Sequence, residues 1–332
     1  MKYISLITEY TKHFLIMMYK LLIKMYRLIR RCFLLLENVI KEYIYEIKCR
    51  NYTERTIKGY KNNLNRWCVY CNNELKIFQL EEINHIHIKK YLNFLKSKGL
   101  SESYINTILK NIRSFYNYCQ KEEYCLNICK KVSWLKEKKT IIQTFTDVEV
   151  KKIINYYSMN SYINARNKCI VSVLIDTGIR CSELCNIKRI DVKETTIYIF
   201  GKGRKERIVP ISHKLKKVMI KYERIRNLYL SDNTLNYDNY FLSFRNKPLT
   251  IEAVERVVKL ACNGVVRDEI RCSPHTCRHY YAQAQLRNGL DVYSLSRLLG
   301  HDDISITKRY LEGLQDMKIV ELGLYISPLM SL

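Results

Sequence analysis

The first third of the chain places hydrophobic residues at helical spacing. Over residues 37–130 they recur every three or four positions, with many lysines and asparagines between them, and this pattern predicts amphipathic α-helices. One helix is expected over about 37–48, and a second begins after Thr53, whose hydroxyl can cap its first turn. A third covers about 86–98, and a fourth begins at Ser101. Four helices with short connections predict a small helical bundle.

The pattern from residue 143 to residue 332 is also mostly helical, with one change of period. Thr146 and Glu149 have the spacing of a capping box at the start of a helix. Two short runs rich in β-branched residues, 196–200 and 207–211, flank a segment that contains two glycines. This arrangement predicts a β-hairpin. A mainly α-helical second domain with one small β-hairpin is therefore expected.

Two further segments carry an excess of positive charge. Residues 1–36 place apolar side chains on one helical face among lysines and arginines, and no apolar run approaches the ~20 residues that cross a bilayer. Three interpretations stay open: a helix that contacts DNA or a partner, a helix that lies in a membrane surface, or upstream sequence read from too early a start codon. Residues 131–142 are expected to form a basic linker between domains at 37–130 and 143–332.

The overall charge narrows the class of partner. The 332 residues include 57 Lys+Arg and 32 Asp+Glu, a net charge of +25. Such an excess indicates a polyanion, most economically nucleic acid, because each neutralised phosphate releases counterions. A membrane surface is the alternative. With 47% hydrophobic and 27% charged residues, the chain has the composition of an ordinary globular protein.

The cysteines do not indicate a disulfide framework or a metal site. There are 13, an odd number scattered along a long chain, and no secretory signal precedes them. Cys68 and Cys71 form one C-x-x-C, but no second pair follows at the spacing of a zinc site, and both lie in an apolar helical stretch. Buried structural thiols are therefore expected. The expected compartment is a reducing cytoplasm.

The first candidate for chemistry is Arg180. Gly178 is expected to end one helix, and the next begins near Ser182, so Arg180 lies at a helix N-terminus where backbone N–H groups favour an anion. Its planar guanidinium can hold two oxygens of one phosphate. Glu183, three residues later, can brace it. Taken alone, the segment is better explained by a surface Arg–Glu pair.

A second basic segment begins at Pro274, which favours the first turn of a helix. His275 and Arg278 then lie three residues apart and project from one face of that helix. A histidine beside a fixed guanidinium can exchange a proton while the arginine holds phosphate charge. His279 is expected to point elsewhere on the helix and to be structural.

Three more candidates lie in turns. Lys202, at the tip of the predicted hairpin, can present an ammonium group to a leaving oxygen, although it is also typical of a polar turn. His301 follows Gly300, which is expected to end a helix, and Tyr310 follows nine residues later. Tyrosine is a weak nucleophile with a pKa near 10, but among these cations its phenolate is expected to be strongly favoured. Other tyrosines are expected in helices and in the core: Tyr280, Tyr281 and Tyr293.

Together these motifs resemble, in order and spacing, those of the tyrosine recombinase (phage integrase) family. They are Thr177-Gly178-Ile179-Arg180 with Glu183-Leu184, Gly201-Lys202-Gly203 with Arg207 and Pro210, His275-x-x-Arg278-His279, Leu299-Gly300-His301, and Tyr310. The resemblance covers roughly residues 38–332. It implies a mainly α fold, with a SAM-like four-helix core-binding domain and a mixed, mostly α catalytic domain.

The resemblance also implies the roles of the side chains. The implied catalytic residues are Arg180, Lys202, His275, Arg278, His301 and Tyr310, with Glu183 in support. The two arginines would hold the non-bridging oxygens of the scissile phosphate. The lysine and the first histidine would manage protons, and the second histidine would support the phosphate. The tyrosine would attack to give a 3′-phosphotyrosyl link and a free 5′-hydroxyl, with no metal, ATP or other cofactor.

The expected partners are double-stranded DNA, further copies of the chain in a tetrameric synapse on two sites, and an accessory bending or directionality factor. An integrase of a mobile element is favoured, because the chain is longer than a minimal Xer-like protein and its composition suggests AT-rich coding DNA. A Xer-type resolvase of chromosome or plasmid dimers is the alternative within the family. A type IB topoisomerase, a DNA-binding accessory protein without cleavage activity and a membrane-associated protein also stay open.

Overall fold

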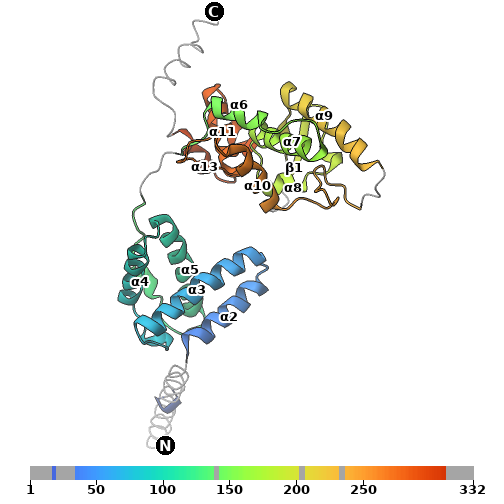
Figure 1. Cartoon of the computed structure of the whole chain (residues 1–332). Coiled ribbons are helices and arrows are strands. Elements are labelled where there is room, and N and C mark those ends of the chain that lie inside the picture. Colours follow the sequence, from blue (N-terminus) through green and yellow to red (C-terminus); the bar gives the residue numbers. More distant parts are fainter. Residues whose placement is uncertain (1–16, 20–33, 138–141, 202–205, 232–235, 312–332) are drawn as a thin grey trace, which may run out of the picture. The chain divides into compact units, whose positions relative to one another are not determined.

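The computed structural model describes residues 17–19, 34–137, 142–201, 206–231 and 236–311. The chain divides into two compact units, residues 1–139 and residues 140–332, which are treated separately (Figure 1). Within the described ranges, none of the helices combines the length and the apolar character that crossing a bilayer requires. Residues 1–36, for which three interpretations were given, lie almost entirely outside the described residues.

The four helices predicted in the first unit are present. They are α2 (Leu36–Cys49), α3 (Glu54–Glu74), α4 (His85–Ser97) and α5 (Glu102–Lys121), with the short 3₁₀ turns η1 (Leu80–Glu82) and η2 (Ile128–Lys131). Thr53 caps α3 by accepting a hydrogen bond from the Thr56 N–H, and Ser101 caps α5 by accepting one from the Tyr104 N–H. These hydroxyls satisfy backbone donors that the first turn leaves unpaired.

The core of this unit surrounds Trp67, which is fully buried on α3. Cys68 and Cys71 are buried beside it as free thiols, and burial raises the pKa of both. Within the described ranges, no group of three or more His, Cys, Asp or Glu side chains is arranged to hold a metal ion. Both cysteines belong to the apolar cluster that contains Trp67, so they pack as small hydrophobic side chains.

The described beginning of the predicted linker packs on α5. The Asn106 amide exchanges two hydrogen bonds with the backbone of Leu135, at 2.9 and 3.0 Å. The guanidinium of Arg113 lies 4.3 Å from the centre of the Trp134 ring. These contacts hold Trp134 and Leu135 against α5 within the first unit. Residues 138–141 lie outside the described residues.

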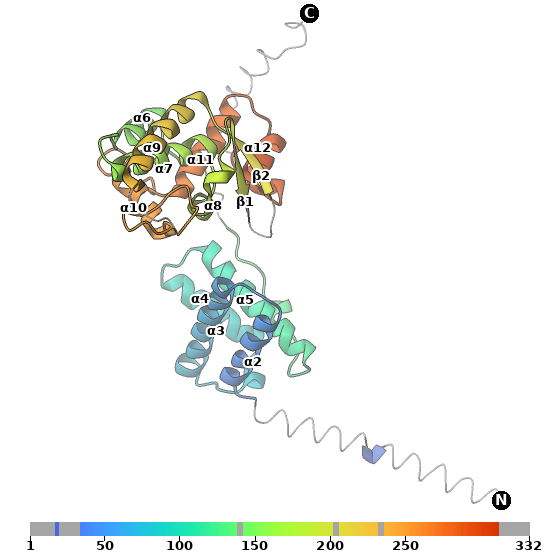
Figure 2. The same ribbon diagram turned by 90° about the vertical axis from the view of Figure 1, so that its right-hand side faces the viewer.

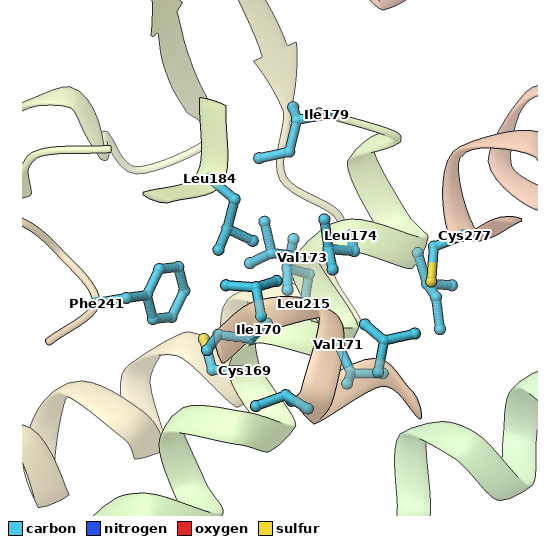
Figure 3. Close-up of a cluster of buried hydrophobic side chains, with 14 of the residues drawn as sticks. Cys169, Ile170, Val171, Val173, Leu174, Ile179, Leu184, Leu215, Phe241 and Cys277 are labelled. Carbon is cyan, nitrogen blue, oxygen red and sulfur yellow. The ribbon is translucent and has the colours of Figure 1, made fainter. Parts of the chain in front are cut away.

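The second unit is built around α7 (Tyr162–Thr177), a helix that is buried on nearly all sides. It packs against α9 (His213–Leu230) and α11 (Pro274–Arg287), as Figure 2 shows. Figure 3 shows side chains of α7 meeting those of the surrounding elements. The core residues labelled there are Cys169, Ile170, Val171, Val173, Leu174, Ile179, Leu184, Leu215, Phe241 and Cys277. Because α7 is enclosed by other helices, it rigidly supports the turn that follows it, and this turn carries Arg180.

The predicted β-hairpin is present as β1 (Thr196–Phe200) and β2 (Glu206–Pro210), paired antiparallel with Ile197 opposite Val209. Ile197 and Val209 are fully buried, whereas Tyr198 is exposed, so the strands follow the alternation of a sheet with one solvent face. In Figure 2 the hairpin lies beside α12 (Val292–Leu299), which contacts β2. The two strands and the surrounding helices confirm the mainly α fold.

The remaining elements of the second unit are short. They are α6 (Asp147–Asn155), α8 (Cys181–Asn186), η3 (Arg189–Asp191), α10 (Ile251–Cys262) and α13 (Ile304–Lys308). The capping box of Thr146 and Glu149 is present at the start of α6. Tyr281 is buried as predicted, but Tyr293 is 64% exposed. Its prediction as a core residue is wrong, because it lies in the first turn of α12 on the side away from the core.

Candidate active site

Arg180 lies in the turn between α7 and α8, as predicted. Gly178 ends α7 with φ +61°, and a Cβ at this position would lie 2.4 Å from the Tyr281 ring, so only glycine allows this close approach. The backbone N–H of Arg180 donates to Glu183 Oε2 at 2.7 Å, and its Nη1 donates to Oε1 at 2.9 Å. The predicted bracing of the guanidinium by Glu183 is confirmed. The Arg180 side chain is 36% exposed, which leaves it accessible to a ligand.

Glu183 also binds a second arginine. Arg207, on β2, donates to both carboxylate oxygens of Glu183, at 2.8 and 2.7 Å, and its Nε donates to the Leu298 carbonyl at 2.8 Å. Burial by itself would raise the pKa of Glu183, but the hydrogen bonds and charge of Arg207, followed by the bonds from Arg180, lower it overall. A buried carboxylate thus joins the hairpin to the Arg180 turn. The sequence motif included Arg207 but gave it no role.

Arg278, from the second turn of α11, is buried, with 4% of its surface exposed. Its Nη1 donates to the Gly178 carbonyl at 2.9 Å, and its Nη2 donates to the Leu299 carbonyl at 2.7 Å. Burial, and then the charge of Arg180, lowers the pKa of Arg278 to about 10, so the group remains a cation at neutral pH. Both carbonyl partners are uncharged. A buried cation held mainly by carbonyls is suited to an incoming anion.

His301 completes this side of the site. Its Nε2 lies 2.9 Å from Arg278 Nη2, and its Nδ1 lies 2.7 Å from the Thr307 hydroxyl. Burial, and then the charges of Arg278 and Arg180, lowers the pKa of His301 to about 4, so the ring is neutral at pH 7. Because a guanidinium can only donate, Nε2 accepts and Nδ1 carries the proton that is donated to Thr307. Arg180 Nη2 donates to the Gly300 carbonyl at 3.0 Å, which brings both arginines to the same turn.

Tyr310 is buried beside these groups, with 3% of its surface exposed. Its ring lies nearly parallel to that of His301, with centroids 6.5 Å apart. Burial raises the pKa of Tyr310, and the charges of Arg278 and Arg309 oppose that rise only in part. The prediction that the surrounding cations favour the phenolate is therefore wrong for the protein without DNA. Desolvation of the phenolate outweighs the attraction of the cations.

His279 is a residue whose position the sequence did not reveal. Its Nδ1 lies 3.0 Å from the Tyr310 hydroxyl, so the prediction that it points away from the site is wrong. Burial, and then the charges of His275 and Arg278, lowers the pKa of His279 to about 4. The only signal in the sequence was its place directly after Arg278, because nothing indicated that the segment after α13 returns to that face of α11.

Of the last two predicted residues, His275 is described by the structure and Lys202 is not. His275 is exposed in the first turn of α11, and partial burial together with the charges of Arg278 and Arg271 lowers its pKa. The charges of Arg278 and Arg180 both act on its ring, which places His275 near the two arginines. Lys202 lies outside the described residues. The described structure therefore brings together Arg180, His275, Arg278, His301 and Tyr310.

Comparison with known proteins decides the family. Residues 143–316 match the sequence model of the Phage integrase family, and residues 39–125 match that of its N-terminal SAM-like domain. The chain belongs to the phage integrase family. Proteins of this family are tyrosine recombinases, which catalyse DNA cleavage and rejoining. The resemblance drawn from the motifs is therefore confirmed.

Several relatives of this chain within the phage integrase family are bacterial Xer recombinases. It is 31% identical over 265 residues to tyrosine recombinase XerC of Thermodesulfovibrio yellowstonii, covering 78% of this chain and 85% of the relative. It is 30% identical to XerC of Anoxybacillus flavithermus, with coverages of 84% and 93%. It is also 28% identical to XerD of Oceanobacillus iheyensis, with coverages of 83% and 94%.

Solved structures of family members share the fold. XerH site-specific recombinase bound to palindromic difH substrate superposes with a TM-score of 0.66 at 21% identity, covering 87% of this chain and 84% of that one. A lambda integrase dimer bound to a COC′ core site gives a TM-score of 0.68 at 18% identity, with coverages of 84% and 78%. At these identities the likeness concerns the fold alone.

Proposed function

We propose that this protein is a site-specific DNA recombinase that cuts and rejoins strands of duplex DNA through Tyr310. The observation that carries the proposal is the convergence of two arginines on one turn. Arg180 and Arg278 bind the adjacent carbonyls of Gly300 and Leu299, and the Tyr310 ring lies alongside His301 in that turn. A phosphodiester in this place would meet two guanidinium groups and a hydroxyl nucleophile together.

The two arginines are suited to bind the phosphate. Arg180 is held by Glu183 but remains partly exposed, so it can turn further donors to a non-bridging oxygen. Arg278 is already desolvated and rigid, so stabilising extra negative charge requires little reorganisation when the transition state forms. His301, with its Nδ1 proton fixed on Thr307, supports the arginine that carries that charge.

The chemical step is a transesterification. The Tyr310 oxygen forms a bond to phosphorus and loses its proton, while the bond between phosphorus and the 5′-oxygen breaks and that oxygen gains a proton. By resemblance to the family, His275 and Lys202 carry these protons. The products are a 3′-phosphotyrosyl link and a free 5′-hydroxyl. A 5′-hydroxyl from another strand then reverses the step and releases the tyrosine.

Two of the partners expected from the sequence, duplex DNA and further copies of this chain, follow from this chemistry. Duplex DNA is the substrate, and strand exchange between two sites needs several active sites in one complex. Solved structures of similar fold include a lambda integrase tetramer bound to a Holliday junction, which supports a tetrameric assembly of this chain. An accessory bending or directionality factor is part of the proposal, as is action on cytoplasmic DNA.

For the biological role we propose an integrase of a mobile element. The second candidate is a Xer-type resolvase of chromosome or plasmid dimers, which the relatives named XerC and XerD favour. Sequencing the DNA that becomes covalently attached to the protein in its own cells separates the two. Ends at the boundary of a mobile element support integration, whereas a single recurrent chromosomal site supports dimer resolution.

The activity itself is tested on plasmids that carry two directly repeated copies of the DNA flanking the gene. Wild type is expected to excise the intervening segment, and Tyr310→Phe is expected to bind the same DNA without producing recombinants. Relaxation of supercoils without recombinants would favour the type IB topoisomerase. Binding with no covalent adduct, even on nicked duplexes that trap the intermediate, would favour a DNA-binding accessory protein.

A further inference from the structure

The contact between His279 and Tyr310 links two parts of the site that are distant in sequence. His279 Nδ1 and the Tyr310 oxygen are 3.0 Å apart, and the ring centroids are 5.5 Å apart with planes inclined at 53°. This is hydrogen-bonding geometry, and the two rings are not stacked. Tyr310 is almost fully buried and His279 is mostly buried, so the bond is shielded from water.

The direction of this hydrogen bond follows from the charges around it. Burial, and then the charges of His275, Arg278 and Arg309, disfavour a second proton on the His279 ring. A neutral imidazole can accept a hydrogen bond at Nδ1 when Nε2 carries the proton. The Tyr310 oxygen lies within the influence of the Arg278 and Arg309 charges, which favours keeping its lone pairs toward those cations. The tyrosine hydrogen is then donated to His279 Nδ1.

The position of His279 in the chain gives this bond a geometric consequence. Arg278 and His279 are consecutive residues of α11, in the helical segment Pro274–Arg287. One turn of rigid helix therefore contacts both the proposed phosphate site, through Arg278, and the proposed nucleophile, through His279. On the other side, Thr307 accepts the bond from His301 and its carbonyl receives the Tyr310 N–H at 3.0 Å. The tyrosine is thus fixed at its backbone and at its hydroxyl.

We propose that His279 is a catalytic residue that holds the Tyr310 hydroxyl through Nδ1 and aims its oxygen at the phosphate bound by Arg180 and Arg278. The inference rests on the proposed function, because it assigns a role on the nucleophile side of that reaction. Orientation of this kind matters because displacing a reacting group by about 1 Å can cost roughly a hundredfold in rate. His279 orients the attacking oxygen before the step. The proton that Tyr310 then loses is carried by His275, as proposed above, and Lys202 acts on the leaving oxygen.

The test compares three variants of the full chain on the duplex where wild type forms its covalent adduct. In asparagine the amide nitrogen or oxygen is attached to Cγ, like Nδ1 of histidine, whereas the glutamine amide reaches the position of Nε2. His279→Ala and His279→Gln are expected to slow single-turnover adduct formation by about 10–100-fold. His279→Asn is expected to recover most of the rate. DNA affinity is expected to stay within about threefold of wild type in all three.

A second substrate separates orientation of the nucleophile from help to the leaving group. Replacing the bridging 5′-oxygen by sulfur gives a thiolate that leaves without a proton. Lys202→Ala is expected to regain its rate on this substrate, whereas His279→Gln is expected to stay slow. A merely structural role for His279 would not distinguish asparagine from glutamine, and this comparison remains valid if the alanine variant does not fold.

Each contrary outcome overturns the inference. The role is wrong if His279→Ala forms the adduct as fast as wild type, or if asparagine is as slow as glutamine. It is also wrong if the sulfur substrate restores the rate of His279→Gln, because the defect would then lie at the leaving group. If wild type itself forms no adduct on any DNA tested, the proposed function fails, a result distinguishable from failure of the His279 role alone.

Discussion

At the scale of single residues, Glu183 makes more contacts in the site than the sequence predicted. The sequence indicated only that it braces Arg180. Glu183 is 5% exposed, and its carboxylate receives hydrogen bonds from Arg180 and from both terminal nitrogens of Arg207. Removing the negative charge leaves two arginines close together with less compensation. Breaking a buried ion pair by removing one partner typically costs about 3–5 kcal/mol, because the other charge remains buried.

Glu183→Gln is therefore expected to lower the stability of the second unit by about 2–4 kcal/mol and to slow adduct formation by at least about tenfold. Urea unfolding followed by circular dichroism measures the first effect. The matched control is Glu194→Gln, because Glu194 also pairs with a cation, Lys216, but its side chain is 85% exposed. That variant should change stability by less than about 1 kcal/mol. Equal effects of both substitutions would contradict the account of Glu183.

The lowered pKa values of His279 and His301 predict a dependence of stability on pH. Both pKa values are about 4 in the folded protein, below the ordinary value of about 6.5 for the unfolded chain. Between pH 6.5 and 4 the unfolded chain binds more protons than the folded protein. The contribution of these histidines to the free energy of unfolding is therefore fully present above pH 6.5 and is lost as the pH falls toward 4. Each histidine is expected to contribute about 1–3 kcal/mol to this loss.

The variant His279→Asn isolates one share of that loss. Asparagine cannot take up the proton, so lowering the pH from 6.5 to 4.5 should destabilise wild type but not the variant through this position. The free energy of unfolding of wild type should therefore fall relative to that of the variant over this range. Urea unfolding of the full chain at several pH values measures this difference. A difference that stays constant with pH would show that His279 has an ordinary pKa in the folded protein.

At the scale of elements, the turn at Gly178 holds two parts of the site. Its positive φ allows α7 to end just before Arg180, and its carbonyl accepts the hydrogen bond from Arg278 Nη1. A side chain here would both strain the backbone and meet the Tyr281 ring. Gly264 also has a positive φ, +68°, but a Cβ there would meet nothing within 4 Å. Substituting Gly178 and Gly264 in turn therefore separates the cost of backbone strain from the cost of crowding.

Gly178→Ala is expected to destabilise the second unit by about 2–5 kcal/mol, the sum of backbone strain and overpacking. Gly264→Ala should cost only about 1–2 kcal/mol, from the backbone alone. Circular dichroism reports unfolding of the whole chain, whereas tryptophan fluorescence reports the first unit, because both tryptophans, Trp67 and Trp134, belong to residues 1–139. The fluorescence transition should therefore not shift. Equal costs for the two alanines would mean that the Tyr281 ring yields to the added methyl group.

The helices and the hairpin were predictable because their signals are local. Hydrophobic spacing and capping hydroxyls such as Thr53 and Ser101 depend only on residues within one or two turns. Tyr293 was misplaced because tyrosine fits both a core and a surface, and only the packing of α12 decides between them. The 64% exposure of this residue follows from its place in the first turn, which the sequence pattern does not specify.

At the scale of the whole molecule, the charge of +25 predicts DNA binding that weakens steeply with salt. Each phosphate contact contributes about 0.9 to the slope of log affinity against log salt concentration. Arg180→Ala is expected to reduce the magnitude of that slope by about 1. Tyr310→Phe removes no charge and is the matched control, so its slope should equal that of wild type. Fluorescence anisotropy over a series of salt concentrations measures both slopes, and an affinity independent of salt would contradict phosphate contacts as its main source.

Most candidate site residues could be named from the sequence, but their contacts could not. Arg180 and the Gly300 carbonyl are 120 residues apart in the chain and 3.0 Å apart in the structure, and such closeness depends on packing around α7. The same holds for the bond between His279 and Tyr310, which no local pattern indicates. The raised pKa of Tyr310 was missed for a related reason. Nearby cations are visible in a motif, whereas the depth of burial that outweighs them is a property of the folded unit.

The most direct test of the account is to identify the amino acid that becomes attached to DNA. The protein is trapped on a nicked duplex, digested with protease and nuclease, and the nucleotide-linked peptide is sequenced by mass spectrometry. The expected result is a single linkage, at Tyr310 among the 27 tyrosines, through a 3′-phosphate, and its loss in Tyr310→Phe. Attachment at another residue, or an adduct that persists in Tyr310→Phe, would contradict it.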